Sequence, residues 1–102
     1  IADIYTRITA ARNMLYHVAS MCDQNMPYTT EVAALKLFST EICCEVCKDA
    51  RQIHGAKGLS KDFEIERCLR DAHMLTVAEG TSEICRIVIS NAMYNSKIED
   101  YS

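Results

Sequence analysis

The sequence predicts an all-α protein, an up-and-down four-helix bundle that forms a single domain over residues 1–102. Three observations support this fold class. The chain has only three Gly and one Pro, so few residues interrupt a helix. Its apolar residues recur at steps of three and four, and no segment alternates in the manner of a half-buried strand. A length of 102 residues is that of one small domain with one hydrophobic core.

The first helix is predicted over residues 3–24, where the apolar spacing is most regular. Its inward face is expected to consist of Ile4, Ile8, Ala11, Leu15, Val18 and Cys22. The helix ends before Pro27, because proline cannot continue a helix and disfavours helical geometry in the preceding residue.

The second helix is predicted over residues 31–53, which contain neither Gly nor Pro. Thr29 or Thr30 is the candidate cap, and the helix runs antiparallel to the first. It ends at residues 54–58, which contain two of the three glycines, Gly55 and Gly58. A turn with a positive φ is expected there.

Two shorter helices complete the bundle. Residues 64–73 form the third, with Ile65, Leu69 and Ala72 inward, and residues 77–80 break the pattern. Thr81 or Ser82 caps the fourth helix. Its inward residues are expected to be Ile84, Ile87, Val88 and Met93, and its polar tail from Ser96 is expected to fray.

Charge and composition exclude several classes of protein. The net charge of −3 comes from acidic and basic residues mixed along the chain, without the basic stripe that nucleic-acid binding requires. No apolar run approaches the roughly 20 residues that span a bilayer, and the first residues lack the charged-then-apolar layout of a signal peptide. We therefore expect a soluble intracellular protein. The start at Ile1, without Met, suggests a fragment of a longer chain.

The six cysteines are predicted to be reduced thiols without a metal. Cys43, Cys44 and Cys47 share one helix, which invites a metal-binding or redox interpretation. A structural zinc needs four ligands, however, and no second Cys or His pair has a matching spacing. The histidines, His17, His54 and His73, are dispersed along the chain.

Glu79 is the carboxylate with the most interesting surroundings. It lies in a short Gly-containing break, after the apolar residues Val77 and Ala78. An apolar environment desolvates a carboxylate and can make it a base that works near neutral pH. The alternative is an exposed loop glutamate beside a turn glycine, and the local pattern leaves both interpretations open.

Four blocks of sequence, in this order and spacing, resemble the C-terminal signature of acyl-CoA dehydrogenases. They are QIHG at residues 52–55, SKDF at 60–63, ERCLRDA at 66–72 and EGTSEI at 79–84. The run AALKLF at 33–38 is similar to the preceding part of the same domain, so the resemblance covers nearly the whole chain. It implies the C-terminal helical domain of a flavoenzyme that oxidises the α,β bond of a CoA thioester.

The resemblance also implies roles for the EGT motif. Glu79 is the base that removes the α-proton of the thioester while a hydride leaves the β-carbon for the flavin. The backbone N–H of the same residue helps to polarise the thioester carbonyl. Gly80 contacts the substrate. Some branches of the family carry the base on an earlier helix, so the presence of Glu79 indicates the short- or medium-chain arrangement.

FAD is the cofactor that the resemblance implies. Its expected contacts at the start of the fourth helix are Thr81, Ser82 and Glu83. The FAD of a neighbouring subunit is expected to meet Gln52, Ile53, His54, Gly55 and Ala56. Two positions depart from the family pattern: Ala56 stands where a second Gly is usual, and Cys85 where Gln is usual.

The expected partners are an acyl-CoA substrate, an electron-transfer flavoprotein that accepts the electrons, and further copies of the chain in a homodimer or homotetramer. The resemblance places the enzyme in the cytoplasm, or in the mitochondrial matrix of a eukaryote. An enoyl-CoA reductase of the same fold and a non-catalytic helical oligomerisation module are the alternatives.

Overall fold

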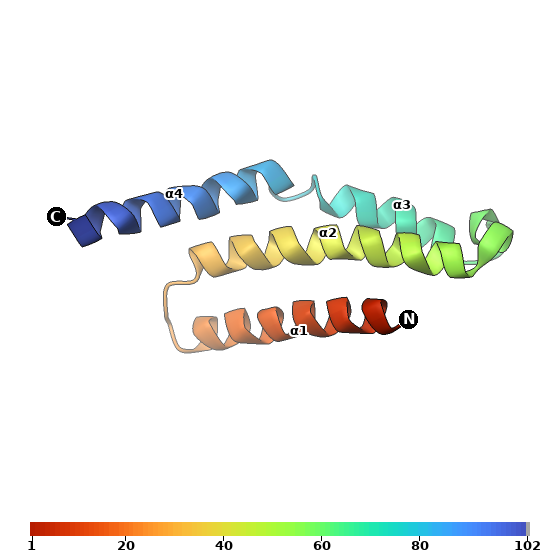
Figure 1. Cartoon of the computed structure of the whole chain (residues 1–102), viewed down its shortest axis with the longest axis horizontal. Helices are drawn as coiled ribbons and strands as arrows, with labels where there is room; N and C mark the ends of the chain where they lie inside the picture. Colours follow the sequence, from red (N-terminus) through yellow and green to blue (C-terminus); the bar gives the residue numbers. More distant parts are fainter. Residues whose placement is uncertain (102) are drawn as a thin grey trace.

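The computed structural model of the chain describes the backbone of residues 1–101 and the side chains of residues 1–97. It contains four α-helices, α1 (Ala2–Asp23), α2 (Thr29–Ile53), α3 (Ile65–Leu75) and α4 (Ser82–Tyr101), and a short 3-10 helix, η1 (Gly55–Leu59). The described residues form no strand (Figure 1). The prediction of an all-α bundle with four helices is confirmed.

Helix α2 is the centre of the molecule. Helix α1 packs antiparallel to it on one side, and α3 and α4 follow one another along another side (Figure 1). Within the described part of the chain, α1 contacts neither α3 nor α4. The helices therefore form three layers, with α2 in the middle, in a body of 59 × 24 × 21 Å.

Helix α1 ends where the sequence predicts. The N–H of Asn25 donates to the carbonyl of Cys22 at 3.1 Å, and Asn25 takes the left-handed conformation with φ of 54°. Asparagine tolerates this conformation better than most residues, and Pro27 follows two positions later. The turn brings the chain back along α1 as α2.

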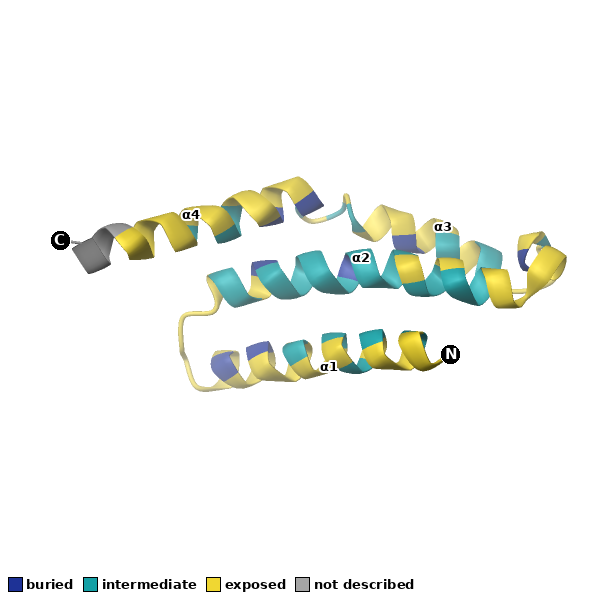
Figure 2. Ribbon diagram, in the orientation of Figure 1, coloured by how far each residue is buried: buried dark blue, intermediate teal, exposed yellow. Residues whose placement is uncertain are grey.

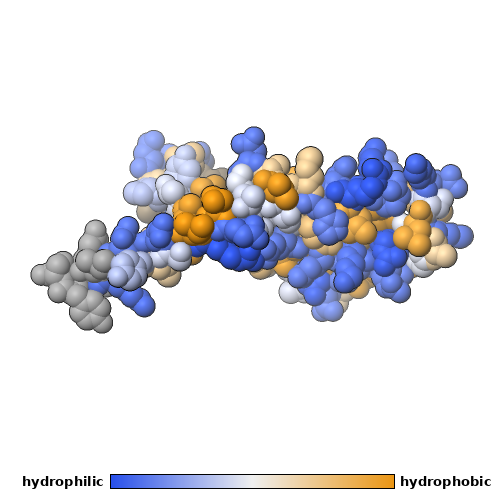
Figure 3. Space-filling view, turned by 90° about the horizontal axis from the view of Figure 1, so that it is seen from above, coloured by the Kyte–Doolittle hydropathy of each residue, from blue (hydrophilic) through white to orange (hydrophobic). Residues whose placement is uncertain are grey.

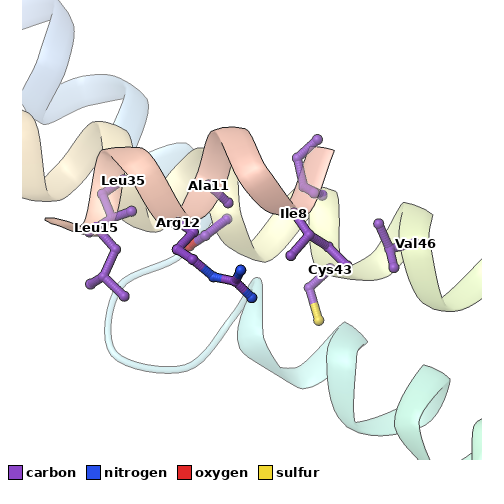
Figure 4. A pocket seen from close by; sticks show the side chains of 9 residues that line it. Ile8, Ala11, Arg12, Leu15, Leu35, Cys43 and Val46 are labelled. Atoms are coloured by element: carbon purple, nitrogen blue, oxygen red, sulfur yellow. The ribbon is translucent and has the colours of Figure 1, made fainter. Parts of the chain in front are cut away.

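The predicted inner face of α1 is only partly correct. Val18 and Met21 are buried, whereas Ile8 is 39% exposed, Leu15 is 51% exposed and Cys22 is exposed. The apolar stripe is wider than the strip that α2 covers. Its uncovered part borders a groove of about 400 Å³ (Figure 4), lined by Ile8, Ala11, Arg12, Leu15, Leu35, Ser39, Ile42, Cys43 and Val46.

The end of α2 contains the predicted glycine turn. Gly55 has φ of 62°, in the region that favours glycine. Gly58 is buried against the last turn of α2, where an added Cβ would lie 2.6 Å from the carbonyl oxygen of Arg51. The close approach explains why this position has no side chain, and η1 folds back onto α2 as a result.

The two helices of the outer layer differ in how well their faces were predicted. In α3, Ala72 is buried and Ile65 and Leu69 are half-buried, as expected. In α4, Val88 is half-buried, but Ile84 and Ile87 are each 51% exposed and Met93 is 60% exposed. The face predicted for α4 is thus partly wrong, because Cys85 instead packs toward α2.

Helix α4 extends to Tyr101, past Ser96, and the fraying predicted from Ser96 stays a prediction. Ser102 and the side chains beyond Lys97 lie outside the described residues.

Apolar side chains remain exposed on every layer (Figure 2). Tyr5 and Tyr16 of α1, Met74 of α3 and Met93 of α4 are all more than half exposed. Figure 3 shows hydrophobic patches over the layer that contains α3 and α4. Among the described helices, none combines the length and apolar composition that a membrane crossing needs. Exposed apolar side chains therefore lie on α1, α3 and α4.

Candidate active site at the turn between the third and fourth helices

Residues 76–81 join α3 to α4 in a tight turn that contains Glu79. Glu79 has φ of 55° and Gly80 has φ of 100°. Glycine adopts such angles freely, but a glutamate in the left-handed region costs on the order of 1 kcal/mol. Strained residues of this kind concentrate at functional sites. The backbone therefore marks Glu79 independently of its sequence motif.

The turn is held by short backbone hydrogen bonds. The N–H groups of Val77 and Ala78 both donate to the carbonyl of Met74 at 3.0 Å. The N–H of Ser82 donates back across the turn to the carbonyl of Thr76, also at 3.0 Å. Among the described residues, the N–H of Glu79 donates to no backbone or side-chain acceptor. This N–H is available to a ligand.

Thr81 is the cap of α4. Its hydroxyl oxygen accepts a hydrogen bond from the N–H of Ile84 at 3.2 Å, which decides between the two predicted caps. Ser82 lies inside the first turn of the helix and is buried, and its hydroxyl has no partner in the described chain. Glu83 follows on the exposed side.

Lys36 of α2 reaches the turn from the neighbouring layer. Its ammonium group donates to the carbonyl of Leu75 at 2.8 Å and to the carbonyl of Gly80 at 2.5 Å. These two carbonyls lie on either side of Glu79 in the sequence. The sequence analysis missed this residue, although a lysine inside the otherwise apolar run of residues 32–38 was a usable signal.

A hollow of about 310 Å³ lies beside the turn, between the first halves of α2 and α4. It is lined mostly by apolar side chains, with Lys36 and the EGT turn at its edge: Thr29, Val32, Ala33, Lys36, Glu79, Gly80, Ile84, Cys85 and Val88. An apolar hollow next to a carboxylate provides a surface for an apolar ligand. Cys85, one of the two departures from the family pattern, lines this hollow and is buried.

The expected desolvation of Glu79 is not provided by the described residues. Glu79 is exposed, Val77 is 65% exposed, and the Glu79 carboxylate forms no ion pair with the described part of the chain. The turn lies end to end between α3 and α4 (Figure 1), and Val77, the apolar residue expected to shield the carboxylate, is itself exposed. Any covering of the carboxylate must come from another part of the protein or from a ligand.

The second group of predicted site residues lies at the far end of α2. Its members are all exposed: Gln52, Ile53, His54, Gly55 and Ala56. His54 is held by a 2.7 Å hydrogen bond between its Nδ1 and the carbonyl of Ala50, and its ring lies 6.0 Å from that of Phe63. Apart from the adjoining residues, no atom lies within 4 Å of the position that a Cβ on Gly55 would take, so the backbone there is open to a ligand.

The two groups of predicted site residues are not brought together in one chain. Helix α3, with 11 residues, runs between the glycine turn and residues 79–83. At the rise of an α-helix this is a separation of roughly 16 Å. The chain therefore presents two separate exposed surfaces, one at each end of α3.

Two cysteines on α2, Cys44 and Cys47, are in surroundings that keep their thiols protonated. Burial, followed by the neighbouring Cys43, raises the pKa of the Cys47 thiol to about 11. Burial also raises the pKa of the Cys44 thiol. The thiolate is the form that attacks electrophiles and binds metals, so both thiols are poor at either task. The described residues contain no group of His, Cys, Asp or Glu that could hold a metal ion.

We expect Cys47 to react slowly with iodoacetamide at pH 8, because almost none of it is thiolate, whereas the exposed Cys22 reacts early. Peptide mass spectrometry of the folded protein after short alkylation measures this order. In the denatured chain all six thiols should titrate, and metal analysis should find no zinc. Labelling of Cys47 as fast as Cys22, or one equivalent of bound zinc, would contradict the interpretation.

Comparisons with known proteins agree with the resemblance noted in the sequence. Residues 1–94 match the family described as acyl-CoA dehydrogenase, C-terminal domain. A probable acyl-CoA dehydrogenase of Bacillus subtilis, YngJ, is 43% identical over 93 residues, which are 91% of this chain and 24% of that protein. The caffeyl-CoA reductase-Etf complex subunit CarC of Acetobacterium woodii is 40% identical over 93 residues, with the same two coverages.

The fold is also that of a solved dehydrogenase. The structure of butyryl-CoA dehydrogenase from Megasphaera elsdenii superimposes with a TM-score of 0.89 at 32% identity, over 91% of this chain and 24% of that one. The chain thus spans about a quarter of the length of each of the relatives described here.

Proposed function

The chain belongs to the acyl-CoA dehydrogenase family, as part of its C-terminal domain, and from this premise we propose that it carries the catalytic base of an FAD-dependent acyl-CoA dehydrogenase. The observation that supports this best is the geometry of Glu79. It is held in a strained left-handed turn, its carboxylate is unpaired among the described residues, and it borders an apolar hollow.

In the proposed reaction the Glu79 carboxylate takes the α-proton of an acyl-CoA thioester. FAD, when bound, accepts the hydride that leaves the β-carbon, so that the substrate loses two hydrogens and gains an α,β double bond. The unpaired N–H of Glu79 donates to the thioester oxygen, where negative charge develops as the α-proton leaves. Gly80 has no side chain and lets the substrate approach the backbone closely.

The exposed surfaces fit FAD in two places. Thr81 and Glu83 lie at the positive end of the α4 dipole, with Ser82 packed behind them. Residues 52–56 offer an open backbone at Gly55. Because α3 separates the two surfaces, we propose that residues 52–56 contact the FAD bound to a neighbouring copy of the chain. Ala56 is exposed in that surface, and its effect on FAD binding stays a prediction.

The remaining assignments follow from the same proposal. The reduced enzyme passes its electrons to an electron-transfer flavoprotein, and the name of the Acetobacterium relative, a subunit of a reductase-Etf complex, supports this partner. The assembly is a homodimer or homotetramer. The compartment is the cytoplasm, or the mitochondrial matrix in a eukaryote.

The test uses the complete dehydrogenase chain that contains this domain. An equivalent protein is a chimera in which residues 1–94 replace the matching quarter of the Bacillus subtilis relative. The purified protein should show a flavin absorbance band, and anaerobic addition of saturated acyl-CoA thioesters of graded chain length should bleach it. Absence of the flavin would refute the proposal in favour of a non-catalytic oligomerisation module.

The second candidate is an enoyl-CoA reductase of the same fold, which the reductase among the relatives favours. The same preparation distinguishes it. A dehydrogenase is reduced readily by acyl-CoA and reoxidised by electron-transfer flavoprotein. A reductase is reduced by its electron donor and reoxidised by enoyl-CoA, with little bleaching by acyl-CoA.

A further inference from the structure

We propose that Lys36 is a positioning residue for the Glu79 base: it holds both ends of the strained turn and leaves the Glu79 N–H free for the substrate. This inference rests on the proposed function of Glu79. It concerns a residue on another helix, 43 positions earlier in the sequence, whose ammonium group has two partners at the turn.

The first partner, the carbonyl of Leu75, would accept from the N–H of Glu79 if α3 continued through residues 76–78. The helix instead ends at Leu75, and Lys36 supplies the missing donor at 2.8 Å. The hydrogen bond from Lys36 satisfies the carbonyl at the end of α3 without using the N–H of Glu79. That N–H is the group assigned to the thioester oxygen.

The second partner is the carbonyl of Gly80, which precedes the cap of α4 and lies outside the helix. The N–H of Ile84, four residues later, donates to the hydroxyl of Thr81 and is not available to this carbonyl. Lys36 again supplies the donor, at 2.5 Å. One ammonium group thereby holds a carbonyl four residues before Glu79 and the carbonyl of the residue after it.

Lys36 is anchored well for this task. One turn away on either side of it, Ala33 and Thr40 are buried in the packed face of α2. The lysine itself is half-buried, and its hydrogen bonds to carbonyls are charge-assisted. Its ammonium lies more than 4.0 Å from the Glu79 carboxylate, since no ion pair joins them. It therefore acts on the backbone of the turn and not on the base directly.

The test is single-turnover flavin reduction in the complete enzyme, with the limiting rate expressed per bound FAD. Lys36→Met keeps the length of the side chain and removes its charge and donors. The limiting rate should fall by about 10- to 100-fold, because a misplacement of the base of about 1 Å has an effect of that size. The substrate dissociation constant, taken from the concentration dependence of the same reaction, should change much less.

Two variants provide the controls. Lys48→Met removes an exposed lysine of the same helix and should react at the wild-type rate. Lys36→Gln keeps an NH₂ donor on a shorter side chain, and is the variant to use if Lys36→Met does not yield a folded flavoprotein. It should also be slow, because its single amide cannot reach both carbonyls.

A Lys36→Met or Lys36→Gln enzyme that holds FAD and reduces it at the wild-type limiting rate would overturn the inference, even if its melting temperature and flavin content are lower. Glu79→Gln, measured in parallel, separates this failure from that of the proposed function. A slow Glu79→Gln with a fast Lys36→Met refutes the role of Lys36 alone. A fast Glu79→Gln refutes both.

Discussion

Glu79→Gln in the complete enzyme is expected to retain FAD and to lower flavin reduction by acyl-CoA on the order of 10³-fold or more. Glutamine has nearly the shape of glutamate, but its amide cannot accept the α-proton. The carboxylate is unpaired among the described residues, so its removal should break no contact of this chain that holds the fold. Anaerobic stopped-flow spectroscopy at the flavin band measures the effect, together with flavin content and melting temperature.

Two further variants separate loss of the base from loss of structure. Glu64→Gln removes another exposed carboxylate, ahead of α3, and should leave the rate unchanged. Glu79→Gly removes the base and also relieves the left-handed strain at φ of 55°, so it should be inactive yet no less stable than the wild type. Near-wild-type reduction of flavin by Glu79→Gln would place the base on another residue of the complete enzyme.

The 102-residue chain by itself is expected to self-associate through its helices, to bind no FAD tightly and to oxidise no substrate. Its buried apolar residues within the described part are few: Val18, Met21, Ala33, Ala72 and Cys85. Its radius of gyration of 16.8 Å exceeds the roughly 13 Å of a compact domain of this size. The groove between α1 and α2 and the outer faces of α4 are left open to water or to further copies (Figures 3 and 4).

Sedimentation velocity over a range of concentrations should show species larger than a monomer. Titration of FAD, followed by its fluorescence, should show no saturation in the submicromolar range, because residues 52–56 and 79–83 present separate surfaces in one chain. The complete enzyme under the same conditions is the positive control. Stoichiometric FAD binding with acyl-CoA oxidation by the isolated chain would contradict this expectation.

The sequence was sufficient for the helices and their ends, because these depend on local features. Pro27 cannot continue a helix, Gly55 follows the end of α2 with a positive φ, and Thr81 caps α4 through its own hydroxyl. The faces were predicted less well. The spacing of Ile8, Leu15 and Ile84 identifies apolar sides of helices, but not which side another helix covers. That depends on packing with α2, which leaves much of each outer helix uncovered.

Within the candidate site, the EGT motif identified Glu79, but its left-handed backbone and its unpaired N–H depend on how the turn closes. Lys36 was missed because its partners are carbonyl oxygens, which every residue carries and which leave no pattern in a sequence. Sequence reasoning also expected Val77 and Ala78 to shield the carboxylate. Residues that adjoin Glu79 in the sequence do not cover it in the structure, since Val77 is 65% exposed and Glu79 is exposed.

Transfer of the α-proton to Glu79 is tested most directly by hydrogen exchange with solvent. An acyl-CoA whose β-carbon is replaced by sulfur has an α-proton but no β-hydride, so exchange in D₂O isolates the proton step from flavin reduction. Loss of the α-proton, followed by mass spectrometry of the thioester, should be rapid with the wild-type complete enzyme and at the uncatalysed rate with Glu79→Gln. Exchange by Glu79→Gln at the wild-type rate would contradict the assignment of the base.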